Sequence, residues 1–140
     1  MSSVAQIKPD QVKNTDIVLQ FYTDVFKNRS VEICDALMAE DYINHSELVE
    51  NGREPFKAYF KHFYKTFGQS GSDIIKVFEQ DDLVCVYATH WAKNKLFTVR
   101  FKAMDVYRLE AGKLVEHWDS IQALNGFSQF IFSIKAILKL

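Results

Sequence analysis

Apolar side chains recur at helical spacing through the first half of the chain. Between positions 11 and 27 they recur every three or four residues and predict an amphipathic helix. Its apolar positions are Ile17, Val18, Phe21, Tyr22, Val25 and Phe26. Ser30 can cap a second, shorter helix. A short strand at 42–45, followed by a loop, is expected before the next helix.

A third helix is the most strongly patterned element. Six aromatic residues follow Pro55 at intervals of three and four, and a proline suits the first turn of a helix. These aromatic residues are Phe56, Tyr59, Phe60, Phe63, Tyr64 and Phe67. Such a stripe is typical of a helix face that packs on a core.

The hydrophobic period changes from 3.6 to 2 after the Gly- and Ser-rich segment 68–72. Four strands are predicted, at 74–79, 83–91, 97–109 and 114–122. Helices followed by strands with short turns indicate an α+β fold, with the helices on one face of a curved sheet. Residues 125–140 return to helical spacing, and this tail is expected to cover an open end of the sheet or to pack on a second subunit.

The strand at 97–109 has one clearly apolar face, and that face contains an aspartate. Its inward positions are Phe97, Val99, Phe101, Ala103, Asp105, Tyr107 and Leu109. Successive side chains of a strand point to opposite faces, so Asp105 is expected in the interior.

The turn 110–112, Glu-Ala-Gly, suits a three-residue hairpin loop with Gly112 in the left-handed conformation. This loop pairs Leu109 with Lys113 and places Asp105 opposite His117. The inward set of the last strand is then Val115, His117, Asp119 and Ile121. A two-residue loop would shift the pairing by one and place Trp118 inside instead.

Asp105, His117 and Asp119 are therefore expected to cluster on an apolar concave surface. Two interpretations remain open for them. They can form a hydrogen-bonded structural pair that holds the sheet together, or they can be acid/base groups whose pKa values are shifted by desolvation.

Length and composition limit the class of protein. The 140 residues suit one domain (1–140, with a core at 11–122), and the net charge of −1 argues against nucleic acid as a partner. Cys34 and Cys85 lie in apolar runs and are interpreted as buried free thiols. Without a signal peptide or an apolar run of membrane-spanning length, a cytoplasmic location is expected and a membrane is not expected as a partner.

Three segments carry a family resemblance: "DYINHSELVENGREPFKAYF", "DDLVCVY" and "MDVYRLEAGKLVEHWDSIQ". Together they resemble the SnoaL-like polyketide cyclases of the nuclear-transport-factor-2-like superfamily, over residues 11–122. The resemblance implies a cone: a strongly curved mixed sheet around a deep pocket, closed by about three helices, here with a C-terminal helical tail.

The resemblance also supplies catalytic candidates. Asp119 matches the aspartate that serves as acid/base in an intramolecular aldol closure. His45 matches the general-base aspartate of the similar ketosteroid isomerases, and Asp105 matches their oxyanion-hole aspartate. The similar limonene-epoxide hydrolases use an arginine and an aspartate where this chain has Val86 and Ala88, so that hydrolysis is not expected.

His45 and His90 can each be interpreted in two ways. His45 starts a loop, where it either reaches the pocket mouth or is exposed. His90 either lines the pocket or packs in the core. His117, Tyr22 and Trp91 complete the expected substrate-binding set.

No metal is expected, because His45, His117 and Asp119 lack the spacing of a known metal motif. No cofactor is expected either. The expected function is acid/base chemistry, of aldol or isomerase type, on a small cyclic or polyketide-like carbonyl compound. The alternative is a non-catalytic ligand-binding or dimerisation module of the same fold, and a homodimer is expected in either case.

Overall fold

The computed structural model describes residues 12–126, 128–130 and 134, so most of the predicted tail helix at 125–140 lies outside the described residues. The helical elements precede the four long strands, and β1 lies between the last two helical elements. They are α1 (Asn14–Tyr22), its π-helical continuation η1 (Thr23–Lys27), the short α2 (Cys34–Leu37) and α3 (Arg53–Thr66). The strands are β1 (Met38–Asn44), β2 (Gln69–Gln80), β3 (Leu83–Lys93), β4 (Thr98–Glu110) and β5 (Lys113–Ala123).

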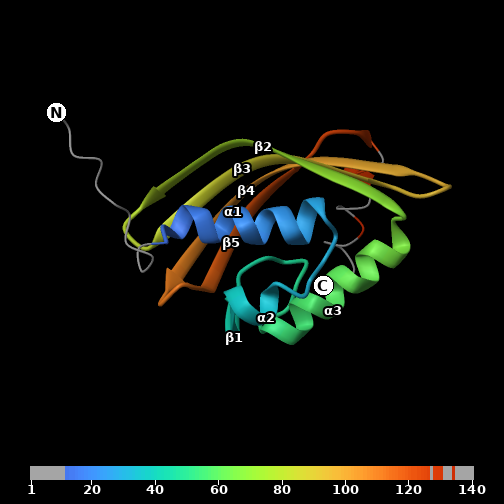
Figure 1. The fold of residues 1–140 in the computed structure, drawn as a ribbon. Helices are drawn as coiled ribbons and strands as arrows, with labels where there is room; N and C mark the ends of the chain where they lie inside the picture. The colour runs from blue at the N-terminus through green and yellow to red at the C-terminus, as the bar shows by residue number, and fades with distance from the viewer. Residues whose placement is uncertain (1–11, 127, 131–133, 135–140) are drawn as a thin grey trace.

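The five strands form one mixed sheet in the order β1-β5-β4-β3-β2. β1 pairs with β5 in parallel, and all other neighbours are antiparallel. Figure 1 shows the long strands as a curved layer, with α1 along its concave side and α2 and α3 farther from it. The predicted α+β class and curved mixed sheet are confirmed.

The main core lies between α1 and the concave face of the sheet. Phe21 is fully buried and meets the ring of Tyr107 on β4 edge to face, with ring centroids 5.7 Å apart. Val84 and Val86 on β3 are equally buried. The helical spacing of α1 and the alternation of β3 and β4 thus direct their apolar sides to one interior.

The β4–β5 hairpin confirms the inward direction predicted for Asp105 and His117, but not that of Val115, because Leu114 is the buried residue there, and not the predicted pairs. Its loop has two residues, Ala111 (φ 49°) and Gly112 (φ 78°), so Glu110 pairs with Lys113. A β-bulge follows, in which Val115 is the extra residue. Because of this bulge, the side chain of His117 points inward again. Asp105 therefore opposes Asp119, and Tyr107 opposes His117, two positions away from the predicted pairing.

β2 begins five residues earlier than predicted, inside the Gly- and Ser-rich segment. Gly71 pairs with Trp91 on β3, and the indole lies directly over it. A Cβ at Gly71 would come within 2.5 Å of the indole nitrogen. The glycine is therefore needed for close approach and does not mark a turn.

Candidate active site

A cavity of about 340 Å³ opens between the concave face of the sheet and α3. The aromatic stripe of α3 forms one wall, because all six of its residues line the cavity. Along the stripe, Phe56 is buried, whereas Tyr59, Phe60, Phe63 and Tyr64 are partly exposed. The stripe therefore faces a hollow along most of its length.

Asp105 and His117 form a buried pair at the inner end of this cavity. The His117 Nε2 atom lies 2.8 Å from Asp105 Oδ1, and its Nδ1 atom lies 2.9 Å from Asn44 Oδ1. Asn44 Oδ1 also accepts a hydrogen bond from the Ser46 backbone N–H at 3.0 Å. Because Asn44 Oδ1 is an acceptor, the Nδ1 atom of His117 carries a proton and donates it there.

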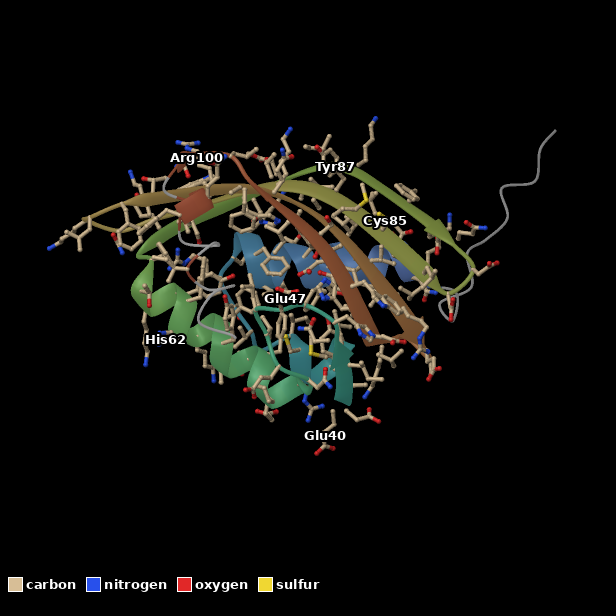
Figure 2. The ribbon with its side chains drawn as sticks, turned by 180° about the vertical axis from the view of Figure 1, so that it is seen from behind. Glu40, Glu47, His62, Cys85, Tyr87 and Arg100 are labelled. Carbon is tan, nitrogen blue, oxygen red and sulfur yellow. The ribbon has the colours of Figure 1, made fainter. Side chains whose placement is uncertain are left out.

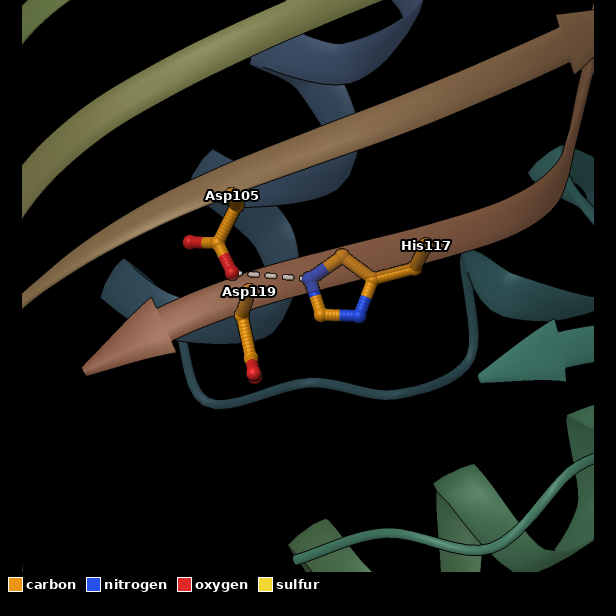
Figure 3. Close-up of side chains that lie close together, drawn as sticks. All are labelled: Asp105, His117 and Asp119. Carbon is orange, nitrogen blue, oxygen red and sulfur yellow. Dashed lines mark hydrogen bonds and ion pairs between the residues drawn. The ribbon is translucent and has the colours of Figure 1, made fainter. Parts of the chain in front are cut away.

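Asp119 lies beside this pair and completes the predicted cluster. Single ligand atoms of Asp105, His117 and Asp119 lie within 4.8 Å of one another (Figure 3). Burial raises the pKa of the Asp119 carboxyl, and the nearby Asp105 carboxyl raises it further. The charge of His117 and a hydrogen bond with Ser46 oppose this shift. The result is a carboxyl that is partly desolvated and faces the cavity.

A second chain of hydrogen bonds reaches Asp105 from the opposite side. The fully buried Tyr22 hydroxyl donates to Asp105 Oδ2 at 3.2 Å and lies 2.8 Å from His90 Nε2. Ser72 Oγ lies 2.7 Å from His90 Nδ1. Burial lowers the pKa of His90, which favours its neutral form. Asp105 thus joins two polar chains, one through His117 and one through Tyr22.

The other predicted site residues occupy different surroundings. Tyr22 lies behind the cavity wall, whereas His90, His117 and Trp91 line the cavity. His45 lies outside it: its side chain is 43% exposed, bonds Glu116 Oε2 at 2.7 Å and stacks on Trp118 at 5.0 Å. β5 directs Trp118 to the convex face, and His45 follows it there. The expected position at the cavity mouth is therefore wrong for His45.

Sequence reasoning missed Asn44 and Ser72. Asn44 is on β1, which lies at the edge of the described sheet beside β5, and it pairs with His117 in that ladder. The inward alternation of Tyr42 and Asn44 was the one available signal for Asn44. Ser72 was assigned to a turn because glycine and serine surround it.

Asp105, His117 and Asp119 also form a candidate cation site. Asp105, His117 and Asp119 are chemically suitable ligands, but Asp105 and His117 already satisfy each other. A divalent ion would have to replace their 2.8 Å hydrogen bond. This donor set fits an acid/base site better than a metal centre.

The sequence matches the family model of the SnoaL-like polyketide cyclases over residues 16–130. The chain belongs to this family. No curated protein matches this SnoaL-like chain in sequence. Membership of the family supports a cyclase- or isomerase-type function, without fixing the substrate.

Solved structures similar to this SnoaL-like protein share its fold. A candidate polyketide cyclase from Acidithiobacillus ferrooxidans is 19% identical with a TM-score of 0.71, covering 94% of this chain and 99% of that one. A candidate SnoaL-like polyketide cyclase from Jannaschia sp. CCS1 is 16% identical with a TM-score of 0.70, covering 92% and 96%. IdmH from Streptomyces antibioticus is 17% identical with a TM-score of 0.67, covering 79% and 93%.

Among the residues described, no helix combines the length and the hydropathy needed to cross a bilayer.

Proposed function

We propose that this protein is a cofactor-free acid/base enzyme that moves a proton next to a carbonyl group. The substrate would be a small cyclic or polyketide-like carbonyl compound, in an aldol closure or an isomerisation. The observation that carries the proposal is Asp119, a carboxyl with a raised pKa beside a buried Asp–His pair, in a cavity walled by aromatic rings.

Asp119 has the central role in this mechanism. Its carboxylate removes a proton from the carbon next to the carbonyl, and the electron pair of that C–H bond becomes an enolate. In an aldol closure, the enolate carbon attacks a second carbonyl carbon of the same molecule and a C–C bond forms. The protonated Asp119 then returns its proton to the resulting alkoxide, so the enzyme ends in its starting state.

Asp105 acts in this proposal by holding His117. Both of its oxygens accept hydrogen bonds from the protein, one from Tyr22 and one at His117 Nε2. His117 in turn lowers the pKa of Asp119, which limits the effect of burial. Since His45 lies on the convex side, it takes no part in the proposed proton transfer.

The experiment measures deuterium uptake from solvent at the α-carbon of cyclic ketones and 1,3-diketones, followed by NMR. We expect Asp119→Asn to slow the catalysed exchange by about 100-fold or more, as loss of a general base does. Asp82→Asn changes an exposed aspartate in a turn and serves as the matched control. Exchange that is no faster with the parent protein than with Asp119→Asn, across all compounds, would contradict the proposal.

The alternative proposal is a non-catalytic, dimeric ligand-binding module, and one observation favours its dimeric part. Residues on the convex face form an apolar row across four strands. Each residue of the row pairs with the next across a strand ladder. From β2 to β5 they are Phe78, Cys85, Val106 and Trp118. Phe78 is 58% exposed and Trp118 is 37% exposed. A homodimer built on this face, in the cytoplasm, is compatible with either proposal.

A further inference from the structure

We propose that Ser72 is a nucleophile at a second reactive centre of the cavity, where His90 activates it for acyl transfer from esters or thioesters. The inference does not rest on proton transfer by Asp119. It rests on the chain Ser72–His90–Tyr22–Asp105, which links β2, β3, α1 and β4.

The geometry matches the requirements for an activated nucleophile: a hydroxyl in contact with a base, and a base oriented by a third group. Ser72 Oγ lies 2.7 Å from His90 Nδ1, and His90 Nε2 lies 2.8 Å from the Tyr22 hydroxyl. That hydroxyl donates its single proton to Asp105 Oδ2 at 3.2 Å. Its oxygen must therefore accept the Nε2–H of His90, which leaves the Nδ1 lone pair for the Ser72 proton.

The hydrogen-bond chain from Ser72 to Asp105 runs from the cavity into the core. Ser72 and His90 both line the cavity, so a bound molecule can reach the hydroxyl. Tyr22 is fully buried and Asp105 is almost so, which keeps water away from the orienting part of the chain. Burial also lowers the pKa of His90, and the neutral imidazole is the form that can accept a proton. The reacting residues Ser72 and His90 are therefore accessible from the cavity, whereas the orienting Tyr22 is buried.

A neighbouring serine offers a donor for the carbonyl oxygen of the substrate. Ser70 and Ser72 are two residues apart on β2 and both line the cavity, as side chains on the same face of a strand do. Arg29 Nη1 donates to Ser70 Oγ at 2.7 Å, so the Ser70 oxygen is an acceptor and its own O–H can donate to a ligand. A hydroxyl polarised by a guanidinium suits an oxygen that gains negative charge.

The proposed reaction has two balanced halves. Ser72 Oγ attacks the acyl carbon and forms a C–O bond, while its proton passes to His90 Nδ1 and the carbonyl electron pair moves to oxygen. When that pair returns, the bond to the alkoxide or thiolate breaks, and His90 protonates the leaving group. Water then attacks the acyl carbon while His90 Nδ1 takes one of its protons. The acyl C–O bond to Ser72 Oγ breaks, His90 gives the proton to Oγ, and a carboxylic acid is released.

The test is covalent labelling with a small dialkyl fluorophosphate, which transfers its phosphoryl group to an activated serine and releases fluoride. We expect one adduct per chain, located at Ser72 by peptide mass spectrometry. Ser72→Ala should remove this adduct, and His90→Asn should slow labelling by about 100-fold or more. Ser120→Ala alters an exposed serine on β5 and should label at the parent rate.

Three results would overturn this inference: no adduct on the parent protein, an adduct at another residue, or equal labelling of Ser72→Ala. Thermal unfolding of each variant shows that it is folded. If His90→Asn does not fold, the comparison of Ser72→Ala with Ser120→Ala still decides. Deuterium exchange depends on Asp119, whereas covalent labelling depends on Ser72. The two proposals can therefore fail separately.

Discussion

At the scale of single residues, Asp105 is the group at which the two polar chains of the cavity meet. His117 contacts one of its oxygens and Tyr22 donates to the other, so this carboxyl group holds partners on two different elements. Asp119 lines the same cavity but is less buried than Asp105. Two aspartates on opposed positions of one ladder are thus expected to respond differently to the same substitution.

Asp119→Asn is expected to raise the free energy of unfolding by about 1 kcal/mol near pH 7. Burial raises the pKa of Asp119 in the folded protein, so ionisation above that pKa opposes folding. Below the unfolded pKa of about 3.9 the carboxyl is neutral in both states, and the advantage of asparagine should disappear. Urea unfolding at several pH values between about 3 and 7 measures the difference.

The matched variant is Asp105→Asn. It leaves partners of the carboxyl unsatisfied and should lower the free energy of unfolding by about 1–3 kcal/mol. An Asp119→Asn variant that loses stability as Asp105→Asn does, or gains the same amount at every pH, would show that Asp119 is a structural carboxylate.

At the scale of elements, one arginine fixes the connection between α3 and β2. Arg29 has a left-handed backbone (φ 59°), and its guanidinium donates to the carbonyls of Tyr64 and Phe67 at the end of α3 and to Ser70 at the start of β2. It also lies over the ring of Tyr64, 4.7 Å from its centroid. A cation at this C-terminal end of α3 also interacts favourably with the helix dipole.

Arg29→Ala is expected to lower the free energy of unfolding by about 2–3 kcal/mol, because the charged hydrogen bonds are lost. Arg29→Gly removes the same side chain but adopts positive φ without strain, so its loss should be smaller by about 1 kcal/mol. Denaturant unfolding of both variants measures this. Equal losses would mean that the left-handed backbone at this position carries no cost.

Alternation predicted most faces of the strands correctly, except at Leu114 and Val115, and predicted few of the contacts. It placed Asp105 and His117 in the interior correctly, because period 2 depends only on the strand itself. The pairing depended on a two-residue turn and on the extra residue Val115, neither of which the apolar pattern encodes. The contacts of Ser72 with His90 and of His90 with Tyr22 join positions 18 and 68 residues apart, for which the sequence contains no local signal.

At the scale of the whole molecule, the sheet has two apolar faces and the described helices cover only one. Figure 2 shows Cys85, Tyr87 and Arg100 on the side of the sheet away from α1 and α3. The convex row from Phe78 to Trp118 lies on this outer side, with His45 stacked at its end. The two end residues of the row, Phe78 and Trp118, are exposed, and exposed apolar side chains on one face are typical of an interaction surface.

If a second copy covers this face, Trp118→Lys should convert the dimer to a monomer at concentrations where the parent is dimeric. A buried lysine without a partner is costly, so we expect at least a tenfold weaker association. Leu96→Lys, at a residue that is 86% exposed in the β3–β4 turn, is the control. Sedimentation equilibrium measures the masses.

Removing residues 125–140 distinguishes the two candidate interfaces. If that deletion separates the subunits and Trp118→Lys does not, the tail makes the dimer and the convex face has another use. A parent protein that is monomeric throughout would contradict the homodimer.

The aromatic stripe of α3 has a consequence for evolution as well as for binding. In most helices such a stripe packs on other parts of the same chain, but among the described residues this one borders a cavity of about 340 Å³. A molecule that fills this space does what a core side chain does, and it stabilises the fold in proportion to its affinity and concentration. A substitution that reshapes the stripe therefore changes ligand preference and thermal stability together, and selection cannot adjust one without the other.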